Sequence, residues 1–274
     1  REVHTVSFFH QTFYEYTLAR QYASGGKSLV KDIAESFQGL EIRTLIKAVL
    51  EYERGHNIMQ FIDDSRSLIE SGDIRFHIKL LAISILAFAT NPEASEKKLI
   101  KDACKKDERI MLYFLRGVQD NGWFSTVKFL IKDILPGQKR DNSILFPIIG
   151  CLSKFAFNHS EDVYDLVNSI KDEDARLFSI AYVLRSHNDY SQSCVLKAYS
   201  EARPQNTHFS VDLIRDAFQT NEKFAFEETE KLLIEYLHSD EKSNRHDGYE
   251  LADVLFPELL NSRPQKLLQV LDNS

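Results

Sequence analysis

Apolar residues return at intervals of three and four through nearly the whole chain, and this periodicity restricts the fold more than any other feature of the sequence. The interval matches the turn of an α-helix, about 3.6 residues, so successive segments each present one apolar face. Leu45, Val49 and Tyr52 show the pattern. Helix-stopping clusters separate the segments, namely Gly-Asp at 72–73, Asn-Pro at 91–92, Pro-Gly at 136–137 and Arg-Pro at 203–204. The sequence therefore predicts an all-α fold.

Composition also favours helices over strands. The chain has 274 residues but only 10 Gly and 6 Pro, fewer tight-turn residues than an all-β protein of this length would need. Hydrophobic residues make up 43% and charged residues 27%, which is ordinary for a folded protein and argues against disorder throughout. We expect helices at residues 9–24, 28–37, 41–55, 58–71, 73–90, 93–105, 107–120, 123–135, 143–157, 160–171, 173–187, 190–202, 207–220, 223–238, 247–260 and 263–272.

An internal repeat emerges when the turns are aligned. Asparagine closes one helix or opens the next at positions about 34 residues apart on average, which are Asn57, Asn91, Asn121, Asn158, Asn188, Asn221 and Asn261. Asparagine suits such a turn because it tolerates the left-handed backbone conformation and also caps the next helix. Aliphatic pairs follow within the second helix of the repeats, at Leu68-Ile69, Leu99-Ile100, Leu130-Ile131, Leu166-Val167, Leu232-Leu233 and Leu267-Leu268.

A helix pair of this length cannot bury its apolar face alone, so neighbouring pairs stack into a continuous core. The sequence therefore predicts an α-solenoid of stacked helix pairs. Its geometry is HEAT-like or TPR-like, but the repeat is degenerate, because the signatures of tetratricopeptide and ankyrin repeats are missing. We divide the chain into an N-terminal segment at 1–24, connecting helices at 25–56 and a helical repeat domain at 57–274. The alternative is an irregular helical domain in which the asparagine spacing is accidental.

Two prolines fall within predicted helices. Pro147 lies within the first turn after Ser143, which we expect to cap helix 143–157, and a missing backbone N–H costs little there. Pro257 lies inside helix 247–260, where we expect it to kink the helix.

The charge pattern excludes several classes of partner. The formal charge is -7 and Lys and Arg are spread along the chain, so we expect no general nucleic-acid binding, which requires concentrated cations. The longest apolar stretch, residues 80–89, is too short to cross a bilayer, and no secretory signal opens the chain. We therefore expect a cytoplasmic location and no membrane contact. The missing initiator Met suggests a fragment.

The sequence contains no complete catalytic or metal site. Cys104, Cys151 and Cys194 form no CxxC pair and the histidines form no ligand motif, so we expect neither a zinc site nor a disulfide framework. The run Gly-Gly-Lys-Ser at 25–28 imitates the end of a phosphate-binding P-loop, but Gln21 stands where the first Gly is needed. We expect the isolated chain to be no enzyme, to carry no cofactor and neither to bind nor to hydrolyse ATP or ADP.

The first residues carry a different pattern. The run VSFFHQTFYEYTLARQYA at 6–23 resembles the end of the winged-helix domain in NACHT-type STAND NTPases, the class that includes the NOD-like receptors. The matching positions are Phe8, Phe9, His10, Thr12, Phe13, Glu15, Tyr16 and Ala19. The run departs from the family at Leu18, where a small residue is common.

The resemblance implies a nucleotide switch in a full-length parent protein. His10 would reach the β-phosphate of bound ADP and hold the resting state, since an imidazole N–H makes a charge-assisted bond to a phosphate oxygen. The parent would be a P-loop NTPase that uses ADP and ATP with Mg, with its NTPase domain upstream in the same chain. The helical arm would bind a trigger protein and relieve autoinhibition, in innate or antiphage defence of the AVAST type. The parent could then oligomerise on activation.

Two other functions stay open, a free-standing helical scaffold for partner proteins without a nucleotide switch, and an enzyme with an unrecognised site. For a binding protein we expect the partner on the concave face of the solenoid, anchored by large aromatics near the turns. These candidates are Trp123, Tyr190, Phe224 and Phe226. The alternative role for each is to pack between adjacent helix pairs. Likewise, Phe9, Phe13 and Tyr16 could simply cap the core instead of marking a family.

Overall fold

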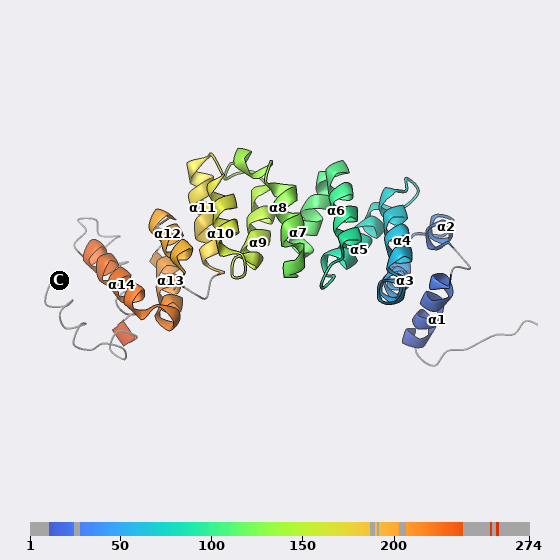
Figure 1. The fold of residues 1–274 in the computed structure, drawn as a ribbon, viewed down its shortest axis with the longest axis horizontal. Helices are drawn as coiled ribbons and strands as arrows, with labels where there is room; N and C mark the ends of the chain where they lie inside the picture. The colour runs from blue at the N-terminus through green and yellow to red at the C-terminus, as the bar shows by residue number, and fades with distance from the viewer. Residues whose placement is uncertain are drawn as a thin grey trace, which may run out of the picture. The chain divides into compact units, whose positions relative to one another are not determined.

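A computed structural model of the chain describes residues 11–24, 28–186, 190, 192–202, 207–237, 253, 256 and 257. Across these residues the regular elements are helices and no strand occurs, which confirms the all-α prediction (Figure 1). The α-helices are α1 (Gln11–Ala23), α2 (Leu29–Ala34), α3 (Ile42–His56), α4 (Ile58–Glu70), α5 (Phe76–Ala87), α6 (Ala94–Lys106), α7 (Glu108–Gly117), α8 (Phe124–Ile131), α9 (Leu145–Phe155), α10 (Ser160–Asn168), α11 (Glu173–Leu184), α12 (Ser193–Ala202), α13 (Thr207–Thr220) and α14 (Glu222–Leu237). Two short 3₁₀ helices are η1 (Asn121–Trp123) and η2 (Leu135–Gly137).

The helix expected at 123–135 is the one that differs most from the prediction. It is divided into η1, α8 and η2, with α8 ending at Ile131. Pro136 has no backbone N–H to continue an α-helix, and the chain forms a short 3₁₀ turn there instead.

Of the predicted helix 247–260, only Asp253, Phe256 and Pro257 are described, and they are helical. The predicted helix 263–272 lies outside the described residues.

Asparagine has the expected role at three of the described turns, whereas Asp120 caps η1 beside Asn121, and the cap position of α10 is His159 and not Asn158. Asn57 lies between α3 and α4. Its side chain caps the start of α4 by accepting a hydrogen bond from the backbone N–H of Gln60 at 3.2 Å. Asn91 has a φ of 49°, the left-handed conformation predicted for such a turn. The side chain of Asn221 accepts from the backbone N–H of Phe224 at 3.2 Å at the start of α14. Asn188 and Asn261 lie outside the described residues.

The cap expected at Ser143 is wrong. Helix α9 begins at Leu145, and it is the side chain of Asn142 that accepts the backbone N–H of Ile144, at 3.0 Å. An asparagine readily forms this turn by bonding the backbone two residues further on. Pro147 does lie in the first turn of α9, as predicted.

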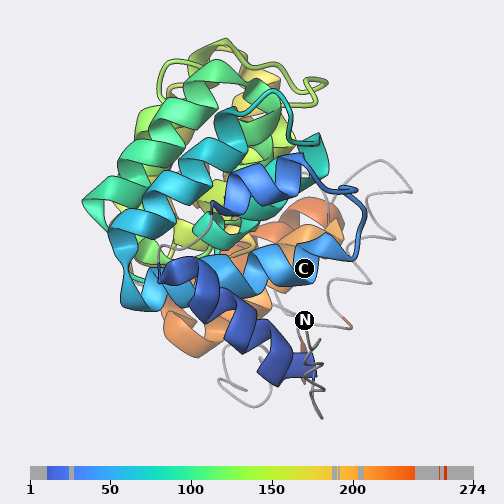
Figure 2. The same ribbon diagram turned by 90° about the vertical axis from the view of Figure 1, so that its right-hand side faces the viewer.

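The helices pack into two compact units, Arg1–Ile131 (unit 1) and Lys132–Ser274 (unit 2). In unit 1 the odd-numbered helices contact one another in order from α1 to α7, and the even-numbered helices do so from α2 to α8. Unit 1 therefore has an odd layer and an even layer, seen in Figure 2 with α1 and α2 in front. In unit 2, α9 contacts α11 and α10 contacts α12. The predicted boundary at 56/57 falls inside unit 1, where α3 packs against both α4 and α5.

Each helix buries one face, and in α3 this face is rotated slightly from the predicted one. Ile46, Val49 and Leu50 are fully buried, whereas Tyr52 is half-buried. The Tyr52 ring stacks on His56 instead, with 4.1 Å between ring centroids. The even-numbered helices bury the predicted aliphatic pairs wherever their side chains are described, in α4, α6, α8, α10 and at Leu232 of α14. In the described part of the chain no helix has the length and apolar character needed to cross a membrane.

Candidate functional site

The described residues contain no group of three or more His, Cys, Asp or Glu that could hold a metal ion. The three cysteines are free thiols. Burial raises the pKa of the Cys104 and Cys151 thiols to about 12, so neither forms the reactive thiolate near neutral pH. These two cysteines are core residues.

Unit 1 has a groove between α3 and α5, with a volume of about 600 Å³. Helix α3 supplies a basic wall, and α5 supplies an apolar wall. The lining residues are Arg43, Lys47, Glu51, Arg54 and Gly55 from α3, and Leu81, Ser84, Ile85, Phe88, Ala89 and Thr90 from α5 and the turn after it. We call this feature the α3–α5 groove.

The basic wall follows from helical spacing. Arg43, Lys47 and Arg54 lie four and then seven residues apart, which places them along one side of α3, next to its buried face. Lys47 pairs with Glu51 at 3.8 Å, but both side chains are more than half exposed, so the pair is weak. Among the described residues, the Arg43 guanidinium has no ion-pair partner. Two cations are therefore available at the mouth of the groove.

The apolar wall follows from the composition of α5, which is apolar around most of its circumference. Its buried residues pack against α3, α4 and α7, which leaves Ile85 half-buried and facing the groove. Phe88 caps the C-terminal end of α5 and remains 57% exposed. An exposed ring beside a basic wall is a common composition for a protein-binding surface.

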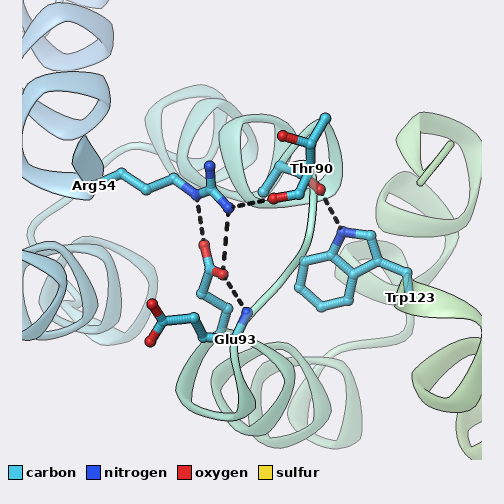
Figure 3. A network of polar contacts seen from close by, with 6 residues as sticks. Arg54, Thr90, Glu93 and Trp123 are labelled. Atoms are coloured by element: carbon cyan, nitrogen blue, oxygen red, sulfur yellow. Dashed lines mark hydrogen bonds and ion pairs between the residues drawn. The ribbon is translucent and has the colours of Figure 1, made fainter. Parts of the chain in front are cut away.

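A polar network joins two residues of the groove, Arg54 and Thr90, to Glu96 at the start of α6 (Figure 3). Arg54 Nε donates to Glu96 Oε1 at 2.7 Å, and Arg54 Nη2 donates to the carbonyl oxygen of Thr90 at 2.8 Å. The backbone N–H of Glu93 donates to Glu96 Oε2 at 2.7 Å, which completes a capping box at the start of α6. Trp123 Nε1 donates to the carbonyl oxygen of Ala89 at 3.1 Å. The turn between α5 and α6 is thus fixed from both sides.

The aromatics predicted to anchor a partner lie mostly in the core. Trp123 and Tyr190 are fully buried and Phe226 is 4% exposed, so only Phe224 is partly accessible. The Trp123 ring packs edge-on against Phe114, at 5.2 Å between centroids. Tyr190 stacks on Phe224 at 6.1 Å. The structure gives three of the four the packing role, because turn positions in this fold lie between successive helix pairs.

Arg43, Lys47 and Phe88 were not singled out from the sequence. The spacing of Arg43, Lys47 and Arg54 was a usable signal, since it places three cations on one side of a predicted helix. That this side faces the end of α5, more than thirty residues later, is a property of the packing.

The N-terminal motif is described only in part. His10 lies outside the described residues, together with Phe8 and Phe9. Helix α1 begins at Gln11, and Ala19 is buried against the rest of unit 1, where α1 packs on α3. Phe13 is 69% exposed and therefore does not cap the core. Tyr16 is half exposed and makes an edge contact with Tyr52, at 5.5 Å.

A buried carboxyl group lies between α3 and α4. The Glu53 side chain is fully buried, and neither of its oxygens has a hydrogen-bond partner. Burial and the neighbouring Asp64 raise the pKa of Glu53 to about 8. Asp64 itself accepts a hydrogen bond from Gln60 Nε2 at 2.9 Å. Glu53 is therefore protonated in the folded protein at pH values where an exposed glutamate is ionised.

We expect the free energy of unfolding to fall by roughly 1–3 kcal/mol as the pH rises from about 5 to about 8. In the unfolded chain Glu53 ionises near its ordinary pKa of 4.5, whereas in the folded state it ionises near 8, so the folded state holds the extra proton between these values. Below this window both states are protonated and the full stability is present. Glu53→Gln should flatten the dependence, measured by urea unfolding at both pH values. Asp63→Asn, on the exposed side of α4, is the control, and equal slopes for wild type and Glu53→Gln would contradict the assignment.

The α3–α5 groove and the packing of the helices are the features of the described residues that bear on function. The groove offers charge and apolar area in one place, and the polar network gives it a fixed shape. A scan against protein-family models, a search of curated proteins and a search of solved structures each found no match for this chain.

Proposed function

We propose that the chain is a protein-binding arm, an α-solenoid built from stacked helix pairs. The observation that carries this proposal is a set of hydrogen bonds between successive turns. Trp123 Nε1 donates to the carbonyl oxygen of Ala89, 34 residues earlier. In unit 2, Asn221 Nδ2 donates to the carbonyl oxygen of Tyr190, 31 residues earlier. These intervals match the repeat of asparagines in the sequence, as expected if equivalent turns of neighbouring repeats touch.

Exposed aromatic residues on the odd-numbered helices support a binding role. In unit 1 the odd layer carries the α3–α5 groove with Phe88. In unit 2, α9 and α11 carry Phe146 and Tyr182, 52% and 38% exposed, on either side of Phe178. Arg140 lies over the Phe178 ring, 5.3 Å from its centroid. Aromatic and arginine side chains contribute most of the binding energy in many protein interfaces, so both surfaces suit a protein partner.

We place this arm in a NACHT-type STAND signalling NTPase, as the regulatory part that binds a trigger protein and relieves autoinhibition. The N-terminal run around His10 supports this placement through its resemblance to that family. The exposed rings of Phe13, Tyr14 and Tyr16 on α1 add to it, because they offer the kind of surface that contacts a neighbouring domain. In this proposal ADP, ATP and Mg bind upstream of the chain, and the output is innate or antiphage defence.

We expect His10→Ala in the full-length parent to raise basal signalling about tenfold. Loss of a phosphate contact would destabilise the resting state by roughly 1–3 kcal/mol. Basal output and ADP retention would be measured together, with His56→Ala as the control, since His56 is exposed at the end of α3 and outside the motif. Unchanged output and unchanged ADP retention would show that His10 has no role in a switch.

The second candidate is a free-standing scaffold that binds partner proteins and has no nucleotide switch. The same groove and aromatic surfaces favour it. The sequence directly upstream separates the two functions, because a Walker A loop followed by an acidic strand is required by the first and not by the second.

A further inference from the structure

We propose that the α3–α5 groove binds an acidic amphipathic helix of a partner protein. This inference rests on the proposed protein-binding function and adds the chemistry of the occupant. The two walls of the groove differ in character, basic on α3 and apolar on α5. A segment that fills the groove must therefore present acidic side chains on one side and apolar side chains on the other.

Charge selects an acidic partner. Arg43 and Lys47 are exposed, and Arg54 is already paired with the buried Glu96, so two cations remain for an incoming carboxylate. Unit 1 is nearly neutral, with 18 Lys and Arg and 17 Asp and Glu. Residues 132–274 contain 16 Lys and Arg and 24 Asp and Glu. The acidic excess of the chain thus lies outside unit 1, which does not itself repel an acidic segment. Complementary charges speed association and fix the register of the bound segment.

The apolar wall selects a helix. Leu81, Ile85 and Phe88 lie four and three residues apart, so they form one stripe along α5, about 10 Å long. The cationic stripe on α3 spans about 16 Å. A partner helix of about ten residues covers both stripes, with apolar residues at every third or fourth position, as in helix-in-groove recognition. Phe88 would become buried in the complex.

The groove is poorly suited to nucleic acid. A phosphate backbone gains affinity from many cations along its path, and here Glu51 lies between Lys47 and Arg54 in the basic wall. The opposite wall is mostly apolar, and the only side-chain hydrogen-bond donors among its lining residues are the neutral hydroxyls of Ser84 and Thr90. The network of Arg54, Glu96 and Trp123 also fixes the groove before binding, which reduces the ordering cost for a shaped partner such as a helix.

The probe is a fluorescein-labelled synthetic peptide of about twelve residues, with Leu and Phe at every third or fourth position and Glu at the others. Binding to the 274-residue chain would be followed by fluorescence anisotropy. We expect saturable binding that the double variant Arg43→Glu/Lys47→Glu weakens about tenfold, and that Phe88→Ser weakens by a similar factor. Replacing each Glu of the peptide by Gln should weaken binding and remove its dependence on salt.

Matched controls keep the result specific. Lys98→Glu reverses an exposed charge on α6, and Met59→Ser removes an exposed apolar side chain on α4, in both cases outside the groove, so neither should change binding. Circular dichroism would establish that every variant keeps its helix content. No saturable binding, or equal binding by groove and control variants, would overturn the proposal. Tighter binding of a single-stranded oligonucleotide to the wild type than of the peptide would overturn it as well.

Failure of this inference is separable from failure of the proposed function. If the peptide does not bind but His10→Ala raises basal output in the parent, the signalling role stands and the groove is not its docking site. If the peptide binds in the groove but His10→Ala has no effect, the docking site stands and the chain is a scaffold without a nucleotide switch.

Discussion

Trp123→Ala is expected to lower the free energy of unfolding of unit 1 by about 3–5 kcal/mol. Trp123 is fully buried, contacts Phe114 and donates its indole N–H to the carbonyl oxygen of Ala89. The substitution removes the apolar contacts, opens a cavity and leaves that carbonyl without its donor. Urea unfolding followed by circular dichroism would measure the loss.

Two further variants divide the effect into its parts. Trp123→Phe keeps an aromatic ring but lacks the indole donor, so it should cost less than the alanine variant, about 1–3 kcal/mol. Phe88→Ala truncates a ring that is 57% exposed and should change stability by under about 0.5 kcal/mol. Trp123 is the only tryptophan of the chain, so its fluorescence reports unfolding of unit 1 in Phe88→Ala. A Trp123→Ala variant with wild-type stability and impaired partner binding would make Trp123 a partner contact after all.

Arg54→Met should cost about 3 kcal/mol, because it leaves the carboxylate of Glu96 buried without its partner. The Glu96 side chain is fully buried and Arg54 retains 27% exposure, so the loss lies at the lower end of the range for a broken buried pair. The double variant Arg54→Met/Glu96→Gln should recover much of the stability, since glutamine removes the charge and still offers an oxygen to the Glu93 N–H. Urea unfolding of the wild type, Arg54→Met, Glu96→Gln and the double variant gives the coupling energy.

A surface pair in the same unit provides the comparison. Lys106 and Glu70 lie 2.8 Å apart, close to the Arg54–Glu96 distance, but their side chains are 66% and 44% exposed. Lys106→Met should therefore cost less than about 1 kcal/mol. If Arg54→Met and Lys106→Met cost the same, burial of Glu96 does not control the energy of the pair.

Features that depend on neighbouring residues could be predicted from the sequence. Helix bounds follow from apolar periodicity and from stop residues, which act within a few residues of their own position, and most predicted bounds agree with the structure. Asn57 and Asn91 end helices because their short polar side chains favour caps and the left-handed conformation, whatever packs around them. The cap at Ser143 failed because two neighbouring residues could both cap, and Asn142 bonds the helix start.

Whether an aromatic side chain points into the core or towards solvent could not be predicted from the sequence. Trp123, Tyr190 and Phe226 are of the residue types that anchor protein partners, but all three are buried by the packing of the helices. The exposed ring in the α3–α5 groove is instead Phe88, which follows directly on the apolar helix α5. Periodicity gives the angle of a residue around its own helix but not which other helix lies there.

The sequence by itself determined the all-α class, the positions of the helices and the repeated turns, since these depend on short-range propensity, capping and periodicity. Only the tertiary structure decided which residues form a site. The α3–α5 groove brings Arg43 and Lys47 close to Phe88, and the polar network joins Arg54 to Glu96 and Trp123 to Ala89. The hydrogen bonds of this network bridge 42 residues between Arg54 and Glu96 and 34 residues between Ala89 and Trp123. The groove exists because α3 packs against α5, which depends on the shape and burial of whole helix faces.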